Sequence, residues 1–279
     1  MHTVSMALSD KKTGTMGSPI DDIAYLARSE HRVRTLVALR DRPRTRSDLW
    51  ERTGVSSSTM RRTVRAFEER NWIRREGHVY ETTQLGAFIA SAMEELIGRI
   101  ETERTLRDVW HWLPGDESGF TLEVCADAVV TVAEPDAPYR PVNRFAELLG
   151  DSDAFRFVGS DIAVLEPCKD VLRKRVVDGM ATEIIDPPAV AKRILATYPD
   201  HCSEPLDRPN FTVLLHDELP PYGIGLFDDR IAVSCYDQAS GSVRVLIDTD
   251  VPAAWEWAES VYSSYRREAR PLAAESLLE

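Results

Sequence analysis

The chain has 279 residues and a mass of 31.4 kDa, which suits two ordinary domains better than one. Its apolar runs are only a few residues long, far below the roughly 20 residues that a bilayer-spanning helix needs. No charged start, apolar stretch and cleavage site follow Met1, so we expect no secretory signal. These features exclude membrane and secreted proteins and predict a cytoplasmic protein with no membrane partner.

The charge balance is strongly acidic. There are 34 Lys and Arg residues against 46 Asp and Glu, and the net charge is -12. Nearly all of the basic residues are Arg, which is typical of halophilic proteins in a high-salt cytoplasm, although GC-rich coding also favours Arg over Lys. The four Cys contain no Cys-x-x-Cys pair and do not indicate a disulfide framework, so we expect a reducing compartment.

Charge also divides the chain into two parts. Residues 21–113 carry a net charge of +2, whereas residues 114–279 carry -15. The first part can therefore approach a polyanion that would repel the second. We predict a disordered segment at 1–20, a winged helix-turn-helix domain at 21–82, a long connecting helix at 83–113, a linker at 114–119 and a regulatory α/β domain at 120–279.

Helix signals are clear in the first part. Apolar residues recur at helical spacing over 21–40, with a possible break near Ser29. Thr45 opens the next helix, because Asp48 three residues later completes a capping box. Gly54 ends that helix and Ser56 caps the one that follows. Two short helices about a glycine-containing turn predict a helix-turn-helix.

The helix after Ser56 has an apolar stripe and an opposite face of hydroxyls and Arg. This pattern suits the DNA major groove, because hydroxyls and helix N–H groups bind phosphate while Arg binds guanine edges or phosphate. Two short strands around Glu76 and Gly77 predict a wing. The predicted contacts to double-stranded DNA are Arg46, Ser57, Ser58, Thr59, Arg61, Arg62, Arg65, Arg74, Arg75 and His78.

A helical pattern of some 30 residues follows, over 83–113. At 1.5 Å per residue this helix is about 45 Å long, too long to be buried against one small domain. We predict that it is the dimerisation helix of a homodimer, since two-fold symmetry also suits paired half-sites on DNA. The alternative is a helix that packs along the second domain of its own chain.

The acidic part alternates short strands and helices, which predicts an α/β domain with a mixed sheet. Hairpins are expected from 211 onward, and a final helix at 252–270. The fold class of the chain is therefore α/β overall: an α+β winged helix, a long connecting helix and a C-terminal α/β domain. The earlier elements are expected as strands at 129–133, 155–158 and 181–185 and as helices at 141–149, 167–178 and 188–198.

No catalytic or metal-binding motif is visible in the acidic part. The phosphate-binding loop, the HExxH helix and the GxSxG elbow are all missing, so we expect no enzyme, no metal and no cofactor. An effector pocket is expected at the strand ends of the α/β sheet. The candidates are Ser160, Asp161, Asp186, His216 and Tyr222, each of which has an alternative role as a capping or turn residue.

The cysteines leave two interpretations open. Cys125, Cys168, Cys202 and Cys235 either converge as a redox or metal sensor, or they are small buried residues of the core.

Several motifs carry a resemblance to a known family. They lie at 48–56, which leads into the DNA-reading helix, and at 67–73, 83–86, 142–149 and 216–223. With these motifs the chain, over about 21–272, resembles the archaeal winged-helix transcriptional regulators related to the methanogenesis regulatory protein (Fil-type) family, the haloarchaeal members above all. Asn71 stands where glycine is more usual, a position where a left-handed backbone is expected. The resemblance implies a one-component transcription factor whose C-terminal domain receives a signal.

We therefore expect a homodimeric, sequence-specific DNA-binding regulator that acts at promoters and responds to a small-molecule effector. Two rival hypotheses remain. In the first, the winged helix is a protein-docking adaptor that binds no DNA. In the second, the regulator responds to oxidation of its cysteines.

Overall fold

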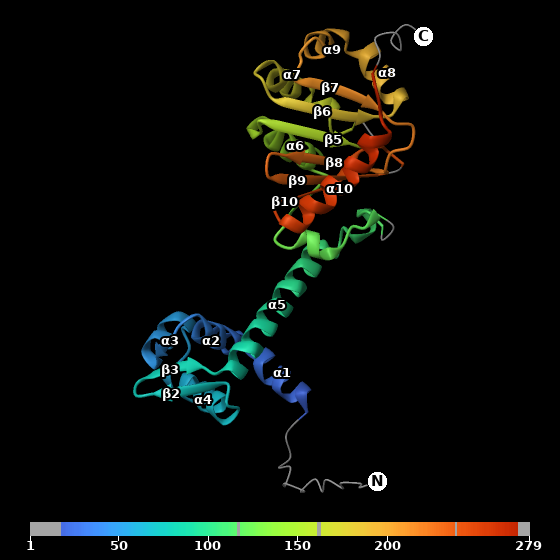
Figure 1. The fold of residues 1–279 in the computed structure, drawn as a ribbon. Coiled ribbons are helices and arrows are strands. Elements are labelled where there is room, and N and C mark those ends of the chain that lie inside the picture. Colours follow the sequence, from blue (N-terminus) through green and yellow to red (C-terminus); the bar gives the residue numbers. More distant parts are fainter. Residues whose placement is uncertain (1–17, 116–117, 161–162, 238, 273–279) are drawn as a thin grey trace, which may run out of the picture. The chain divides into compact units, whose positions relative to one another are not determined.

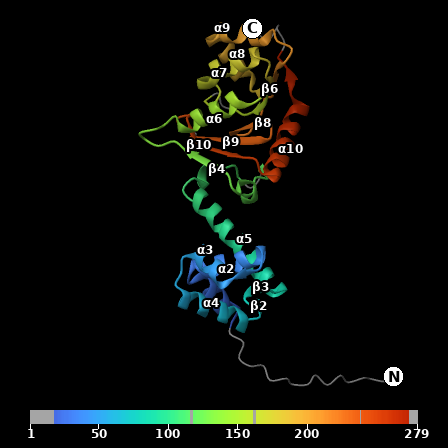
Figure 2. The ribbon, with the colours of Figure 1, turned by 90° about the vertical axis from the view of Figure 1, so that its left-hand side faces the viewer.

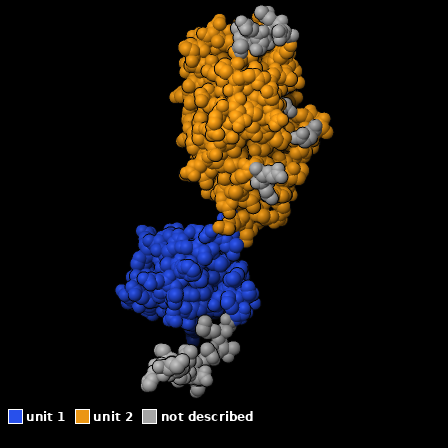
Figure 3. Space-filling model, turned by 45° about the vertical axis from the view of Figure 1, so that its right-hand side comes forward, with its two compact units in different colours: residues 1–98 blue, residues 99–279 orange. Residues whose placement is uncertain are grey.

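The computed structural model describes residues 18–115, 118–160, 163–237 and 239–272 (Figure 1). The chain forms two compact units, residues 1–98 and residues 99–279, and the division falls inside the connecting segment predicted at 83–113 (Figure 3). Nearly all of the 1–20 segment, and part of the 114–119 linker, lie outside the described residues. Among those that are described, no helix is both long and apolar enough to cross a membrane.

The first unit begins with α1 (Pro19–Ala27) and α2 (Glu30–Asp41), so the helix expected over 21–40 is broken near Ser29. α1 begins inside the segment that we predicted to be disordered, and this part of the prediction is wrong. The reason is a capping box: the Ser18 side chain accepts from the Ile20 N–H at 3.3 Å, and Asp21 accepts from the Ser18 N–H at 2.8 Å.

The helix-turn-helix consists of α3 (Arg46–Thr53) and α4 (Ser57–Glu69). The predicted capping box forms between Thr45 and Asp48, and Gly54 ends α3 with a φ of 66°. Buried side chains of α4 then hold the two helices and α2 around one core; the fully buried members include Leu36, Leu39, Leu49, Met60 and Phe67.

The predicted wing is the hairpin β2 (Ile73–Glu76) and β3 (Val79–Thr82). A two-residue strand that was not expected, β1 (Arg44–Thr45), pairs with the other side of β3, giving the sheet order β1-β3-β2. Asn71 precedes the wing with a φ of 55°, as predicted from its place in the motif.

The long helix α5 spans Gln84–Leu106 and is shorter than the predicted 83–113. The chain leaves the helix after Leu106 and makes a short 3-10 turn at Trp110–Trp112. Leu106 and Val109 are only 2% and 4% exposed, and both belong to the core of the second unit. Because these side chains are buried in that core, the helix ends at Leu106 although the apolar residues continue at helical spacing to 113.

The second unit contains an eight-stranded mixed sheet in the order β11-β7-β6-β5-β8-β9-β10-β4 (Figures 1 and 2). β5, β6 and β7 are parallel, and the remaining pairs are antiparallel. The strands are β4 (Val129–Val132), β5 (Ala154–Val158), β6 (Ala181–Asp186), β7 (Phe211–Leu215), β8 (Tyr222–Phe227), β9 (Arg230–Tyr236), β10 (Val243–Thr249) and β11 (Arg270–Pro271).

Two expectations for this unit are wrong. β7 forms no hairpin with β8, because it continues the parallel ladder beside β6, while β8 lies between β5 and β9. A helix, α9 (Pro199–Leu206), was also missed, because Pro199 and Pro205 read as breaks in its sequence. The other helices lie close to their predicted places: α6 (Arg140–Asp151), α7 (Lys169–Val177), α8 (Pro188–Thr197) and α10 (Pro252–Glu268).

The sheet is buried on both faces, with one core cluster around α10 and another around α6 and α7. One charged residue lies fully inside: Asp248 is 0% exposed and accepts hydrogen bonds from Arg144 at 2.8 and 3.0 Å and from Arg230 at 2.8 Å. Two guanidinium groups thus neutralise a carboxylate that would otherwise be costly to bury.

The start of α5 is joined closely to the base of the wing. Thr83 donates its N–H to the Trp72 carbonyl at 3.0 Å and its hydroxyl to the Asn71 carbonyl at 2.6 Å. A Cβ added to Gly86 would lie 1.8 Å from the Trp72 carbonyl oxygen. This position therefore accepts no side chain unless the wing or the helix moves.

We expect Gly86→Ala to destabilise the first unit by about 1–3 kcal/mol, because the obstructing atoms belong to backbone that cannot rotate away. Gly98→Ala is the matched control in the same helix: an added Cβ there meets nothing within 4 Å. That change is expected to stabilise the chain by roughly 0.5–1 kcal/mol. Differential scanning calorimetry of the full chain measures both, and equal melting temperatures for the two variants would show that the contact does not constrain the fold.

Candidate functional site

The sequence of α4 places its polar face outward. Met60, Val64 and Phe67 are buried, so the residues between them face away from the core. The exposed face carries Ser57, Ser58, Arg61, Arg62 and Arg65. This arrangement confirms the amphipathic pattern of the helix.

The Arg residues of this face differ in their partners. Arg65 donates to Glu69 at 3.0 Å, one turn further along the helix. Arg61 and Arg62 have no hydrogen-bond or ion-pair partner among the described residues. Two guanidinium groups on α4 are therefore available to an external anion without breaking an ion pair, whereas the third is shared with Glu69.

The hydroxyl groups at the start of α4 are organised around the N-cap. The Ser56 side chain accepts from the Thr59 N–H at 3.2 Å and lies 3.0 Å from the Ser58 hydroxyl and 2.9 Å from the Thr59 hydroxyl. The half-buried Thr59 thus serves the cap, and Ser57 is the hydroxyl that remains beside the wing.

The wing presents its two Arg residues on opposite faces, because neighbouring side chains of a strand alternate. Arg74 is paired across the hairpin with Glu81, to which it donates a hydrogen bond, and Glu76 lies 3.8 Å away. Arg75 is paired across the hairpin with Tyr80, and its guanidinium donates to the Gly77 carbonyl at 2.8 Å. Arg75 keeps its charge on the face toward the helix-turn-helix.

One surface hollow of about 520 Å³ gathers several of these groups. It lies between the first turn of α3, the first turn of α4 and the wing. Four predicted residues line it, namely Arg46, Ser57, Arg75 and His78, together with Thr45, Ser47, Trp50 and Tyr80. Two helix N-termini and two Arg residues around one opening form an environment that attracts anions.

Sequence reasoning missed Ser47 and Trp50 as lining residues of this hollow. Trp50 keeps 48% of its surface exposed, which is unusual for so large an apolar side chain. Trp50 lies on α3, whose sequence predicts only that the helix packs against α4. Its position in the hollow beside the wing is visible only in the three-dimensional structure.

The predicted effector residues of the second unit do not come together. Tyr222 is buried in the core and stacks on Trp257 with ring centroids 6.5 Å apart. His216 accepts from the Glu218 N–H at 3.1 Å and packs against the Tyr265 ring. Asp161 lies outside the described residues, and neither Ser160, His216 nor Tyr222 lines the cavity described next.

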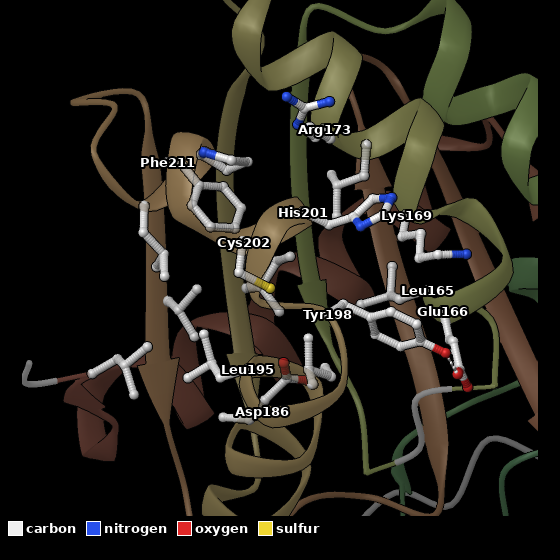
Figure 4. A pocket seen from close by; sticks show the side chains of 18 residues that line it. Leu165, Glu166, Lys169, Arg173, Asp186, Leu195, Tyr198, His201, Cys202 and Phe211 are labelled. Atoms are coloured by element: carbon white, nitrogen blue, oxygen red, sulfur yellow. Dashed lines mark hydrogen bonds between the residues drawn. The ribbon is translucent and has the colours of Figure 1, made fainter. Parts of the chain in front are cut away.

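The second unit contains a mainly apolar cavity of about 100 Å³ beside the parallel strands (Figure 4). Its wall comes from β6, β7, α7, α8 and α9, including the helix that the sequence did not reveal. The last residue of β6, Asp186, lines the cavity with only 5% of its surface exposed. No described residue gives its carboxyl group a hydrogen bond or an ion pair. Sequence reasoning had named Asp186 among the candidates, because it ends a strand.

Three of the other polar residues that line the cavity have hydrogen-bond or ion-pair partners. Tyr198 donates its hydroxyl to Glu166, His201 lies 2.9 Å from Asp170, and Arg173 donates to Glu204 at 2.7 Å. The Lys169 ammonium lies 5.2 Å from the centroid of the Tyr198 ring. The carboxyl group of Asp186 thus lies on the cavity wall without a hydrogen bond from any described side chain.

The four cysteines do not form one cluster. Cys125 and Cys235 share the core around α10, Cys168 belongs to the core on the other face, and Cys202 lines the cavity. Burial raises the pKa of Cys125, Cys168 and Cys235 to about 12, so these thiols stay protonated and react slowly. No group of three or more His, Cys, Asp or Glu residues in the described ranges is placed to hold a metal ion.

The helix-turn-helix and the wing define the first unit as a winged helix-turn-helix domain. The eight-stranded mixed sheet and its helices define the second unit as an α/β domain. Residues 20–105 match the HVO_A0261 N-terminal domain, and residues 138–268 match the middle domain of the methanogenesis regulatory protein FilR1. The second part of the chain therefore carries a domain of the methanogenesis regulatory protein kind, and the resemblance seen in the sequence is confirmed.

Similar solved structures share little sequence with the chain. TrmBL2, described as an archaeal chromatin protein with a novel mode of DNA binding, is 14% identical at a TM-score of 0.42, over 90% of this chain and 99% of that one. NucT from Helicobacter pylori is 14% identical at a TM-score of 0.41, over 52% of this chain and 99% of its own. Nuc from Salmonella typhimurium, a phospholipase D family member, is 8% identical at a TM-score of 0.42, over 53% of this chain and 100% of its own. No curated protein matches the sequence.

The buried Asp186 predicts a dependence of stability on pH. Burial raises its pKa from 3.8 to about 7, so between about pH 4 and pH 7 the folded chain holds a proton that the unfolded chain has released. Stability from this group is therefore greatest at the acidic end and falls as the pH rises through that window. Asp186→Asn cannot ionise, and we expect its melting temperature to exceed that of the wild type at pH 8 and to match it near pH 4.

The difference in melting temperature between the wild type and Asp186→Asn reports on the Asp186 carboxyl group alone. The other ionisable side chains of the cavity are present in both and cancel in the difference; they are Glu166, Lys169, Arg173, Tyr198, His201 and Cys202. Thermal unfolding followed by circular dichroism from pH 4 to pH 8 gives the two profiles. Parallel profiles would mean that the Asp186 carboxyl is solvated in the folded chain.

Proposed function

We propose that the protein is a homodimeric, sequence-specific DNA-binding transcriptional regulator whose second unit receives a small-molecule signal. The observation that carries the proposal is the exposed face of α4, where Arg61 and Arg62 are unpaired, next to the hollow shared by α3, α4 and the wing. The proposal assigns no catalysis to the chain and places it in the cytoplasm at promoters.

In this proposal α4 enters the major groove, which is wide enough to admit one helix. Arg61 and Arg62 then bind guanine edges or phosphates, and Ser57 approaches the backbone at the helix start. The hollow lined by Arg46 and Arg75 accepts a phosphate, since both helix N-termini there carry partial positive charge.

The charge of the whole chain limits what electrostatics contributes. With a net charge of -12, long-range attraction to DNA is weak, and at high salt the release of counterions adds little to the free energy of binding. Hydrogen bonds to base edges and shape complementarity carry more of the affinity in this setting. Side chains that are already oriented and unpaired therefore matter more than the number of positive charges.

We expect Arg61→Ala and Arg62→Ala each to lower operator affinity by about 5- to 150-fold, the equivalent of roughly 1–3 kcal/mol for a lost base contact. Arg65→Ala is the matched control on the same helix: it removes the same charge, but from a guanidinium that Glu69 already holds. Its affinity should fall less. Fluorescence anisotropy with the full chain and an operator duplex measures all three.

The operator comes from chromatin immunoprecipitation and sequencing in the native organism. Wild-type protein should give discrete promoter peaks that a folded Arg61→Ala/Arg62→Ala protein loses. If the wild type gives no peaks under several growth conditions, or if the double variant keeps them, the protein-docking adaptor replaces the proposed function.

The dimer proposal depends on α5. One side of this helix carries exposed apolar residues at helical spacing: Leu85, Phe88 and Leu96 are 61%, 75% and 43% exposed. Such a stripe is typical of a helix that packs against another helix. A second copy of the same chain is the occupant that also gives a DNA-binding unit for each half-site.

We expect Phe88→Glu/Leu96→Glu to convert the dimer to the monomer of 31.4 kDa, because buried carboxylates would oppose helix packing. Thr105→Glu adds a carboxylate on the opposite side of α5 and should leave the dimer intact. Light scattering after size-exclusion chromatography gives the masses. A wild type that is itself monomeric at micromolar concentration would refute this part of the proposal.

The redox-responsive rival has a separate test. If the regulator responds to oxidation of its cysteines, oxidant changes the operator affinity of the wild type. It does not change the operator affinity of a variant in which all four cysteines are Ser. The elevated pKa of the three buried thiols supports the simpler role of these residues as core side chains.

A further inference from the structure

The cavity beside β6 and β7 has a polar requirement that the chain does not meet. Asp186 ends β6 and projects its carboxyl group among apolar side chains; Figure 4 shows it beside Leu195, Tyr198 and Cys202. The residue is 5% exposed, and its carboxyl oxygens have no partner among the described residues. A buried polar group without a hydrogen bond is costly, so a site of this kind is completed by a molecule from outside.

Water alone completes the site poorly. A bound water is retained when two to four polar groups hold it, and the wall around Asp186 is mainly aliphatic and aromatic. Among the remaining polar groups of the cavity, Tyr198, His201 and Arg173 are already paired, and the Lys169 ammonium lies over the Tyr198 ring. The cavity therefore favours a molecule with an apolar body and one group that donates hydrogen bonds.

Charge decides which donor fits best. Once ionised, Asp186 is a buried anion with no cation to balance it, and burial is what raises its pKa to about 7. An ammonium group supplies both the hydrogen bonds and the opposite charge, whereas a hydroxyl supplies one hydrogen bond and no charge. A carboxylate would place a second anion beside the first.

The volume sets the size of the molecule. A cavity of about 100 Å³ is somewhat smaller than the cavities of about 150 Å³ that hold benzene in other proteins. A body of about five or six non-hydrogen atoms fits this space.

We propose that this cavity binds a small alkyl or aryl amine, with the ammonium group on the Asp186 carboxylate and the apolar body against Ile184, Leu195 and Phe211. The binding itself does not depend on DNA. Its regulatory consequence rests on the proposed function, because only a DNA-binding regulator converts this binding into a change at a promoter.

The test uses the full chain and three probes of one shape: 3-methylbutylamine, 3-methylbutan-1-ol and 3-methylbutanoate. Isothermal titration calorimetry at pH 8, where the Asp186 carboxyl is ionised, measures each without DNA. We expect the amine to bind at least tenfold more tightly than the alcohol, and the carboxylate to bind weakest. Asp186→Asn should remove the preference for the amine while the circular dichroism spectrum stays unchanged.

A second variant addresses the apolar wall. Leu195→Asp adds a second carboxylate beside the cavity and is expected to weaken binding of the alcohol, while Lys192→Asp, on the exposed side of the same helix, leaves it unchanged. Equal affinity for the amine and the alcohol, a preference for the carboxylate, or a preference for the amine that survives Asp186→Asn each overturns the proposal.

Operator binding with and without the amine is measured last. If the protein binds the amine but no DNA, the amine site stands and the proposed function is refuted. A protein that binds DNA but not the amine keeps the function and loses the site.

Discussion

The contact between Gly86 and the Trp72 carbonyl is the constraint on which the geometry of the first unit depends. It leaves no room for a side chain, and Thr83 adds hydrogen bonds to the same backbone. Trp72 in turn packs against Phe67 of α4, with ring centroids 5.7 Å apart. Helix α4, the wing and the start of α5 therefore meet at the Trp72 backbone, and the orientation of each depends on the other two.

This joint explains why the hollow of the first unit has a definite shape. The wing can place Arg75 opposite the starts of α3 and α4 only while its base is fixed. Ion pairing then selects among the Arg residues, since Glu69 and Glu81 hold Arg65 and Arg74. The first part of the chain has only a small excess of positive charge. The electrostatic attraction of an anion to this surface therefore depends more on where the unpaired guanidinium groups lie than on how many there are.

Local signals made much of the fold predictable, and tertiary contacts account for what was missed. The Thr45–Asp48 capping box, Gly54 and Asn71 act within a few residues, so the sequence alone predicted the helix-turn-helix and the wing. The end of α5 depends on burial of Leu106 in a distant core, and α9 forms despite Pro205, so neither is visible in periodicity. Of the residues predicted for an effector site, Asp186 lines the cavity, and that it has no partner there depends on side chains from five elements that the sequence does not bring together.

Helix α5 begins in the first unit and ends in the second. Asp186 follows Ile185 in β6, and Ile185 packs in the core cluster that also contains Leu106, the last residue of α5. The first turn of α5 carries Gly86, which fixes the base of the wing. The molecule that we propose at Asp186 would contact β6 from one face of the sheet, and Ile185, on the other face, belongs to the same core cluster as Leu106. A molecule bound in the cavity would shift the packing of this core only by its differential affinity for two states of that packing.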